Sequence, residues 1–148
     1  MAVLLTLVFG SLAARVVGWL GVDYVDSWPR AIAIGLAAMF VMTGVAHFVQ
    51  PLRGAMIAIV PPRLPAPALL VTATGVLELL GAVGLLLPAT RVAAAICLLL
   101  LMLAMFPANV YAARMPNPPK SMNSRLSVRS AEEIVYLAAA VVVAVCSG

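Results

Sequence analysis

Three polar side chains that can do chemistry stand in or beside long apolar stretches. Glu78 lies near the middle of the apolar run 67–87, and His47 and Asn109 lie near the ends of two other runs. An ionised side chain at the centre of a membrane-spanning helix costs at least about 2.5 kcal/mol. We therefore expect Glu78 to face neighbouring helices, either as a packing residue or as part of a ligand or proton site.

Depth along the helices predicts Arg15 as the partner of Glu78. At about 1.5 Å of rise per residue, Arg15 lies roughly 18 Å from the start of its apolar run, and Glu78 lies roughly 16 Å from the same face. An arginine and a carboxylate at one depth reduce each other's desolvation cost. We expect a structural buried pair of Arg15 and Glu78.

The same count predicts that His47 and Asn109 meet near one membrane face, after roughly 24 to 26 Å of helix. Pro107 removes a backbone donor and predicts a kink near Asn109. We expect a polar recess at His47, Asn109 and Pro107, covered by residues 54–62 and able to take a small polar head group. The alternative is that the two side chains satisfy each other and leave no vacancy.

The cysteines and the histidine argue against a metal centre. Cys97 and Cys146 have neither C-x-x-C nor zinc-ligand spacing, so we expect them to pack as small apolar side chains. His47 is the only histidine, and one chain therefore cannot supply two histidines to a haem. No metal site is predicted.

Composition indicates an all-α, polytopic membrane helix bundle. The chain is 65% hydrophobic and 9% charged, with a mean hydropathy of +1.16. Its 148 residues fit one domain, 1–148, and leave no room for a separate soluble catalytic domain. The net charge of +4 comes from basic residues beside the apolar runs, which favours the lipid bilayer as partner and excludes nucleic acid.

The apolar runs predict five spans, at about 3–20, 31–49, 67–87, 92–112 and 131–146. The first run has a small-x-small site at 11–13 but no positive n-region, so we expect an uncleaved helix. The segment between the second and third spans is too short to cross and is predicted to lie at the interface. Ser130 and Glu133 have the spacing of a capping box, which predicts the start of the last helix.

Basic residues on alternate loops predict the orientation in the cell membrane. Six lie on one side and two on the other, which puts the N-terminus in the cytoplasm and the C-terminus outside. The six are Arg53, Arg63, Arg114, Lys120, Arg125 and Arg129, and the two are Arg30 and Arg91.

Four motifs between about residues 30 and 115 suggest a family. They are Phe40-x-x-x-Gly44-x-x-His47-Phe48, Val60-Pro61-Pro62, Thr74-Gly75-Val76-Leu77-Glu78 with Gly81 and residues 84–88, and Phe106-Pro107-Ala108-Asn109. Together they resemble the DoxX-like integral membrane protein family. The resemblance implies a four-helix membrane core, to which residues 3–20 add an extra N-terminal helix. His47, Glu78 and Asn109 stand at motif positions, and the resemblance implies no catalytic role for them.

The resemblance also implies a cellular setting. Members are associated with the membrane part of a thiosulfate:quinone oxidoreductase and with oxidative-stress complexes, although many have no assigned activity. We therefore expect an accessory membrane subunit or partner of a redox complex, with a quinone- or lipid-sized cleft; the quinone comes from the resemblance alone. The alternatives are a non-enzymatic membrane binding or assembly protein, and a transporter of a small solute or proton. A second membrane chain or a homo-oligomeric copy is the expected protein partner.

Overall fold

The computed structural model describes residues 1–147, and every regular element in that range is helical. The prediction of an all-α fold is confirmed. The six α-helices and two short 3-10 helices are α1 (Ala2–Trp19), η1 (Asp23–Val25), α2 (Trp28–Ala46), α3 (Leu52–Ala58), α4 (Pro67–Leu86), α5 (Arg91–Arg114), η2 (Lys120–Met122) and α6 (Leu126–Cys146).

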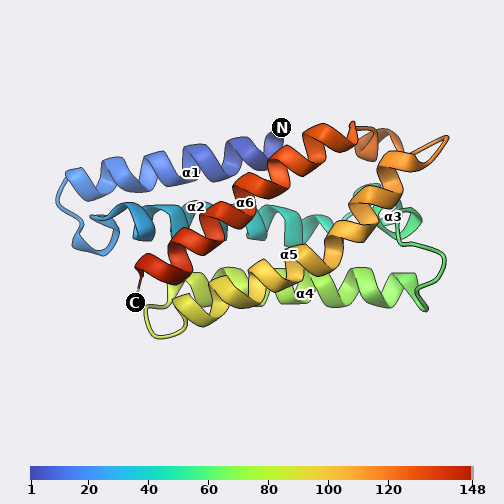
Figure 1. Cartoon of the computed structure of the whole chain (residues 1–148). Coiled ribbons are helices and arrows are strands. Elements are labelled where there is room, and N and C mark those ends of the chain that lie inside the picture. Colours follow the sequence, from blue (N-terminus) through green and yellow to red (C-terminus); the bar gives the residue numbers. More distant parts are fainter. Residues whose placement is uncertain (148) are drawn as a thin grey trace.

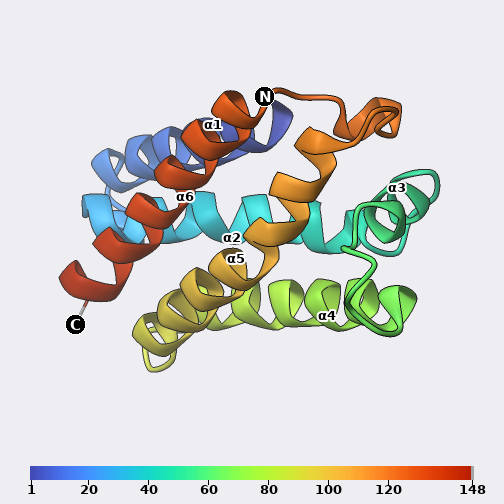
Figure 2. The same ribbon diagram turned by 45° about the vertical axis from the view of Figure 1, so that its right-hand side comes forward.

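Helix α2 is central to the bundle. It packs against α1, α4 and α6, while α5 packs against α4 and α6 (Figures 1 and 2). Small residues allow the close approach of α1, since a Cβ added at Gly35 would lie 2.5 Å from the backbone oxygen of Leu7. The fully buried large side chains come from four helices and form one core: Leu36, Met39, Leu85, Leu98 and Val143.

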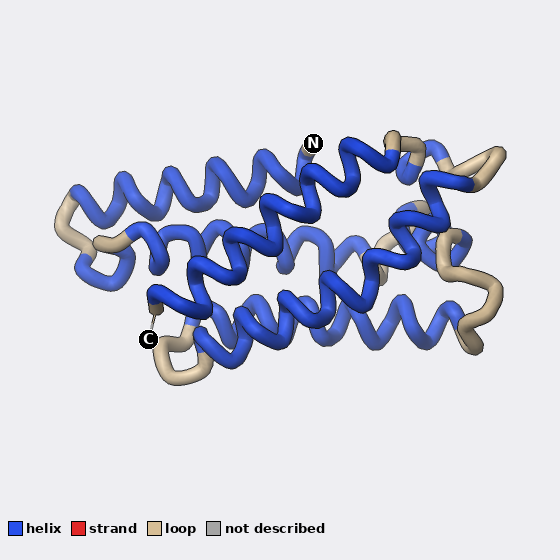
Figure 3. The backbone as a smooth tube through the Cα atoms, viewed as in Figure 1, coloured by secondary structure: helices blue, strands red, loops and turns tan. Residues whose placement is uncertain are grey.

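Four helices, α1, α2, α4 and α5, are long and apolar enough to cross a membrane. Their outward faces carry large exposed apolar side chains such as Phe9, Leu69, Leu80 and Leu100. A soluble protein rarely exposes continuous apolar surface on this scale, whereas lipid covers it without cost. The fold is therefore consistent with a membrane protein. The connections between the long helices gather at two opposite ends of the bundle, as membrane crossing requires (Figure 3).

The helix boundaries differ from the predicted ones mainly in α6. The capping-box prediction is wrong, because α6 begins at Leu126 and Ser130 lies inside it. Arg129, on the extra turn, bonds to Asn109 of α5 at 2.9 Å. Pro107 lies within α5, which remains helical to Arg114 and bends in its C-terminal part (Figure 2). The short helix α3 occupies the segment predicted to lie at the interface.

Candidate functional site: a cavity beneath α3 beside a buried carboxyl

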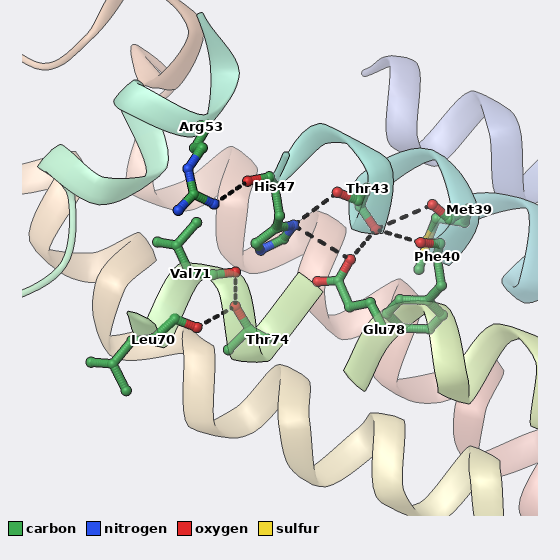
Figure 4. Close-up of polar contacts among 9 residues, drawn as sticks. All are labelled: Met39, Phe40, Thr43, His47, Arg53, Leu70, Val71, Thr74 and Glu78. Carbon is green, nitrogen blue, oxygen red and sulfur yellow. Dashed lines mark hydrogen bonds and ion pairs between the residues drawn. The ribbon is translucent and has the colours of Figure 1, made fainter. Parts of the chain in front are cut away.

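Glu78 lies between α2 and α4 with only 4% of its surface exposed. Its Oε2 is 2.6 Å from the hydroxyl of Thr43 and 3.9 Å from Nδ1 of His47 (Figure 4). Thr43 and His47 share one face of α2 because they are four residues apart, about one helical turn, and Glu78 of α4 meets that face. A buried carboxyl is thus held against α2 by a hydrogen bond to Thr43 and lies close to one imidazole.

Thr43 can satisfy Glu78 in either protonation state. Its single hydroxyl proton points to Glu78 when that carboxyl is ionised. When Glu78 is protonated, the carboxyl can donate to Thr43, whose own proton then goes to the backbone oxygen of Met39, 3.2 Å away. The contact therefore tolerates proton uptake without leaving a stranded donor.

Gly75 makes the approach of His47 to α4 sterically feasible. A Cβ added at Gly75 would lie 2.5 Å from the Cβ of His47, closer than real side chains come. The imidazole accordingly lies between the Thr43–Glu78 contact and the turn of α4 that contains Val71 and Thr74 (Figure 4). Gly75, which is part of the motif noted in the sequence, therefore allows α2 and α4 to pack closely where they cross.

The hydrogen bonds of His47 fix its tautomer. Nδ1 lies 2.8 Å from the backbone oxygen of Thr43, and because a carbonyl only accepts, Nδ1 must carry a proton. His47 follows the last residue of α2 and lies outside that span. Burial lowers its pKa below the ordinary value of 6.5, with the nearby guanidinium of Arg53 acting in the same direction and the bond to Thr43 opposing. The imidazole is therefore neutral at pH 7.

Arg53 attaches α3 to this site. Its guanidinium donates to the backbone oxygen of His47 at 2.9 Å and to the hydroxyl of Thr72 at 3.0 Å. These bonds join α3, the end of α2 and the first turns of α4. Arg53 thereby satisfies one carbonyl group at the end of α2, that of His47.

A cavity of about 610 Å³ lies beneath α3, between α4 and α5. Its wall is mainly apolar, with His47, Thr74 and Asn109 as polar members and Arg63 contributing as well. Met56, Ile59 and Val60 come from α3 and the segment after it, and Pro107 and Ala108 come from the bent part of α5. The volume falls within the range of about 300–1,000 Å³ typical of small-molecule sites.

His47 and Asn109 line this cavity together, as the predicted recess requires. They do not bond to each other. The Oδ1 of Asn109 accepts from Arg129 at 2.9 Å, and His47 bonds to Thr43. The mutual pairing considered as an alternative is therefore replaced by two separate sets of contacts, one on each side of the cavity.

The predicted pair of Arg15 and Glu78 does not form. Arg15 instead bonds to Asp26 at 2.6 Å, and its guanidinium lies over the rings of Trp19 and Trp28 at 5.0 and 5.8 Å. Arg15 stands in the last turn but one of α1, next to the loop that carries Asp26. Helix α2 separates α1 from α4, so equal depth does not bring Arg15 to Glu78.

Thr43, Arg53 and Arg129 are site residues that sequence reasoning missed. Thr43 precedes His47 by one turn, a spacing that could have indicated a shared face. The other two depend on how α3 and α6 fold back, which no local pattern reveals. Cys97 and Cys146 are both free and exposed on the helices. Among residues 1–147, no group of three or more His, Cys, Asp or Glu side chains could hold a metal ion.

The fold and the site together define a helical bundle of membrane-protein type with an apolar cavity at one end. A family model described as a domain of unknown function (DUF8561) matches residues 36–145. The match covers most of the chain, from the middle of α2 to the end of α6, and the chain belongs to this family. No curated protein and no solved structure matches the chain.

Proposed function

We propose that this chain is a small integral membrane protein that binds the polar end of an amphipathic ligand, a lipid or a quinone, in the cavity beneath α3. The main support for the proposal is the cavity itself, whose apolar wall contains His47 from the end of α2 and Asn109 from α5. Ligand sites in proteins combine mostly apolar walls with a few placed polar groups in this way. The buried Glu78 lies directly behind His47.

Five spans and an interfacial α3 are part of this proposal. Helix α6 has 21 residues, which is long enough to cross, and it packs on α2 and α5. Arg129, Glu132 and Glu133 lie in its first turns, where a membrane-crossing helix can keep charges near the surface. Helix α3 has only seven residues and covers the cavity at the end of the bundle, which supports a position at the membrane interface.

An accessory role in a redox or oxidative-stress complex rests on the motifs that resemble DoxX-like proteins. Their residues His47, Glu78 and Asn109 lie at or directly behind the cavity, which supports a shared site in such proteins. The mainly apolar wall and the volume of about 610 Å³ support a ligand of the size of a quinone or quinol ring. Such a ligand would exchange electrons and protons with a partner chain. We therefore propose that the partner is a redox-active membrane or peripheral protein in the same membrane.

Purification in mild detergent followed by mass spectrometry of extracted lipids and co-purifying chains tests this function. Wild-type protein should carry one amphiphile reproducibly, and Ala108→Phe, which fills the cavity, should lose it. His47→Phe and Asn109→Leu should each reduce the amount retained. Ala93→Phe is the matched control, because Ala93 lies on α5 and lines a neighbouring apolar groove between α4 and α5 but not the cavity. Equal retention by Ala108→Phe and wild type would contradict the proposal.

A further inference from the structure

The polar atoms in the cavity wall have a fixed donor and acceptor pattern. Because Nδ1 of His47 holds the proton that bonds to Thr43, Nε2 of the neutral ring carries only a lone pair. Within residues 1–147, Nε2 makes no hydrogen bond. It is not one of the fully buried side-chain atoms that lack a partner, so it keeps some accessible surface. His47 therefore presents an acceptor to the cavity that it lines.

Thr74 and Asn109 complete the pattern. The hydroxyl proton of Thr74 is used within α4, on the backbone oxygens of Leu70 at 3.0 Å and Val71 at 3.1 Å, so Thr74 also offers lone pairs. Arg129 can only donate, so the Asn109 atom that it contacts at 2.9 Å must be the amide oxygen. The amide NH2 group of Asn109 remains as a donor for the cavity.

From this pattern we infer that the cavity selects uncharged amphiphiles whose head group carries a hydroxyl donor beside an acceptor oxygen. The hydroxyl donates to Nε2 of His47, and the second oxygen accepts from the amide of Asn109. A head group with carbonyl oxygens alone would direct lone pairs at the lone pair of His47. The inference rests on the proposed function and names the ligand class of the same site. A monoacylglycerol has this chemistry, and so does a methoxy-substituted quinol.

The positive charge of Arg63 at the cavity suggests one competing ligand, an amphiphile with an anionic head group. Arg63 lines the cavity and is exposed, so an anionic head group could place its charge there. The deeper wall gives such a group no advantage, because Nε2 of His47 and the hydroxyl oxygen of Thr74 both repel an anion. A hydroxyl head group satisfies the deep acceptors and leaves Arg63 in contact with water and lipid phosphates.

Matched ligand pairs test the inference on wild-type protein in detergent. In the first arm, radiolabelled 1-monooleoylglycerol is competed by methyl oleate, which keeps the ester but has no hydroxyl, and by oleate, which is anionic. In the second arm, the reduced and oxidised forms of a decyl-substituted benzoquinone are compared under argon. We expect the hydroxyl-bearing member of at least one pair to bind about tenfold more tightly, since an unpaired buried acceptor costs about that much.

Variants assign the preference to named atoms. His47→Phe should reduce the ratio within the preferred pair to about one, because it removes the acceptor. Asn109→Leu should weaken both members alike and keep the ratio, because their common oxygen loses its donor. A preference confined to the glyceride pair or to the quinol pair supports the inference and identifies the source.

Three results would overturn the inference. Equal affinity within both pairs, with binding lost in Ala108→Phe, would refute hydroxyl selection and leave the proposed function standing. Tighter binding of oleate than of 1-monooleoylglycerol would show that Arg63 selects an anion instead. Absence of specific binding in wild type, with no change in Ala108→Phe, would refute the inference and the proposed function together.

Discussion

Thr43 provides the hydrogen bond that satisfies the buried carboxyl of Glu78. It supplies the contact at 2.6 Å and can reverse the direction of that hydrogen bond when Glu78 takes up or releases a proton. Glu78 has no arginine or lysine partner within hydrogen-bonding distance among residues 1–147. Its burial therefore differs from that of a structural ion pair.

Thr43→Val should destabilise the protein by about 1–3 kcal/mol, because it leaves a buried carboxyl oxygen without its donor. The loss is measured as a lower midpoint of thermal unfolding in detergent. Thr6→Val is the control, since among residues 1–147 the hydroxyl of Thr6 bonds only to Ala2 and Met42, near the start of α1. A change in Thr43→Val no larger than in the control would show that the contact contributes nothing.

The neutral His47 predicts a pH dependence of stability. Its pKa in the folded protein is lowered from 6.5 by burial, so as the pH falls through this value the unfolded imidazole takes up a proton first. Proton uptake then favours the unfolded state, and the free energy of unfolding decreases. The groups that face His47 are Glu78 and Arg53.

The unfolding midpoint should therefore fall more between about pH 7.5 and about pH 5.5 in wild type than in His47→Gln. Glu78 and Arg53 are present in both proteins, so the difference between the two slopes reports His47. Equal slopes would mean that the imidazole titrates alike in the folded and unfolded states.

At the scale of the elements, apolar runs predicted the long helices closely because a continuous run of this length has one stable arrangement in lipid. The start of α6 was mispredicted because Ser130 and Glu133 satisfy a local rule that tertiary contacts override. Arg129 finds acceptors on Asn109 and on the backbone of Met122 and Ser124, and these contacts support the additional turn. Local spacing cannot reveal such partners.

The crossing of α2 and α4 depends on Gly75. Gly75→Ala should destabilise the protein by about 1–3 kcal/mol, because the new Cβ would overlap His47 and force the helices apart. Gly54→Ala on α3 is the matched control, since its Cβ would meet only the flexible end of Gln50, at 3.2 Å. Alanine favours helix over glycine, so the control should be neutral or slightly more stable. Equal unfolding midpoints in the two variants would contradict this role of Gly75.

At the scale of the whole molecule, the sequence predicted that His47 and Asn109 lie at the same end of the bundle but not how the helices are offset. The depth count assumed that every span starts in one plane. The N-terminal amine instead bonds to Glu132 at 2.8 Å, so α1 starts beside the second turn of α6. That offset, together with α2 lying between α1 and α4, explains why Arg15 meets Asp26 and not Glu78. His47 and Asn109 were placed correctly because both lie near helix ends at the same side.

Orientation in the membrane is a prediction for the whole chain. In a background with Cys97 and Cys146 replaced by alanine, cysteines at Ser121 and Ser147 should react with impermeant reagents from opposite sides of the membrane. Ser121 should be labelled from the cytoplasm, because the basic residues gather at that end. Labelling of both positions from one side would remove α6 as a span.

Photo-crosslinking tests the central claim most directly. Purified wild-type protein is irradiated with a diazirine-bearing amphiphile whose reactive group lies next to the head group, and the modified peptides are identified by mass spectrometry. The account predicts labelling concentrated in residues 56–64 and 105–109, which include residues that line the cavity and none that line the groove. That labelling should be lost in Ala108→Phe but not in Ala93→Phe. Labelling spread evenly over the lipid-facing helices, or concentrated in the groove between Leu77 and Cys97, would contradict it.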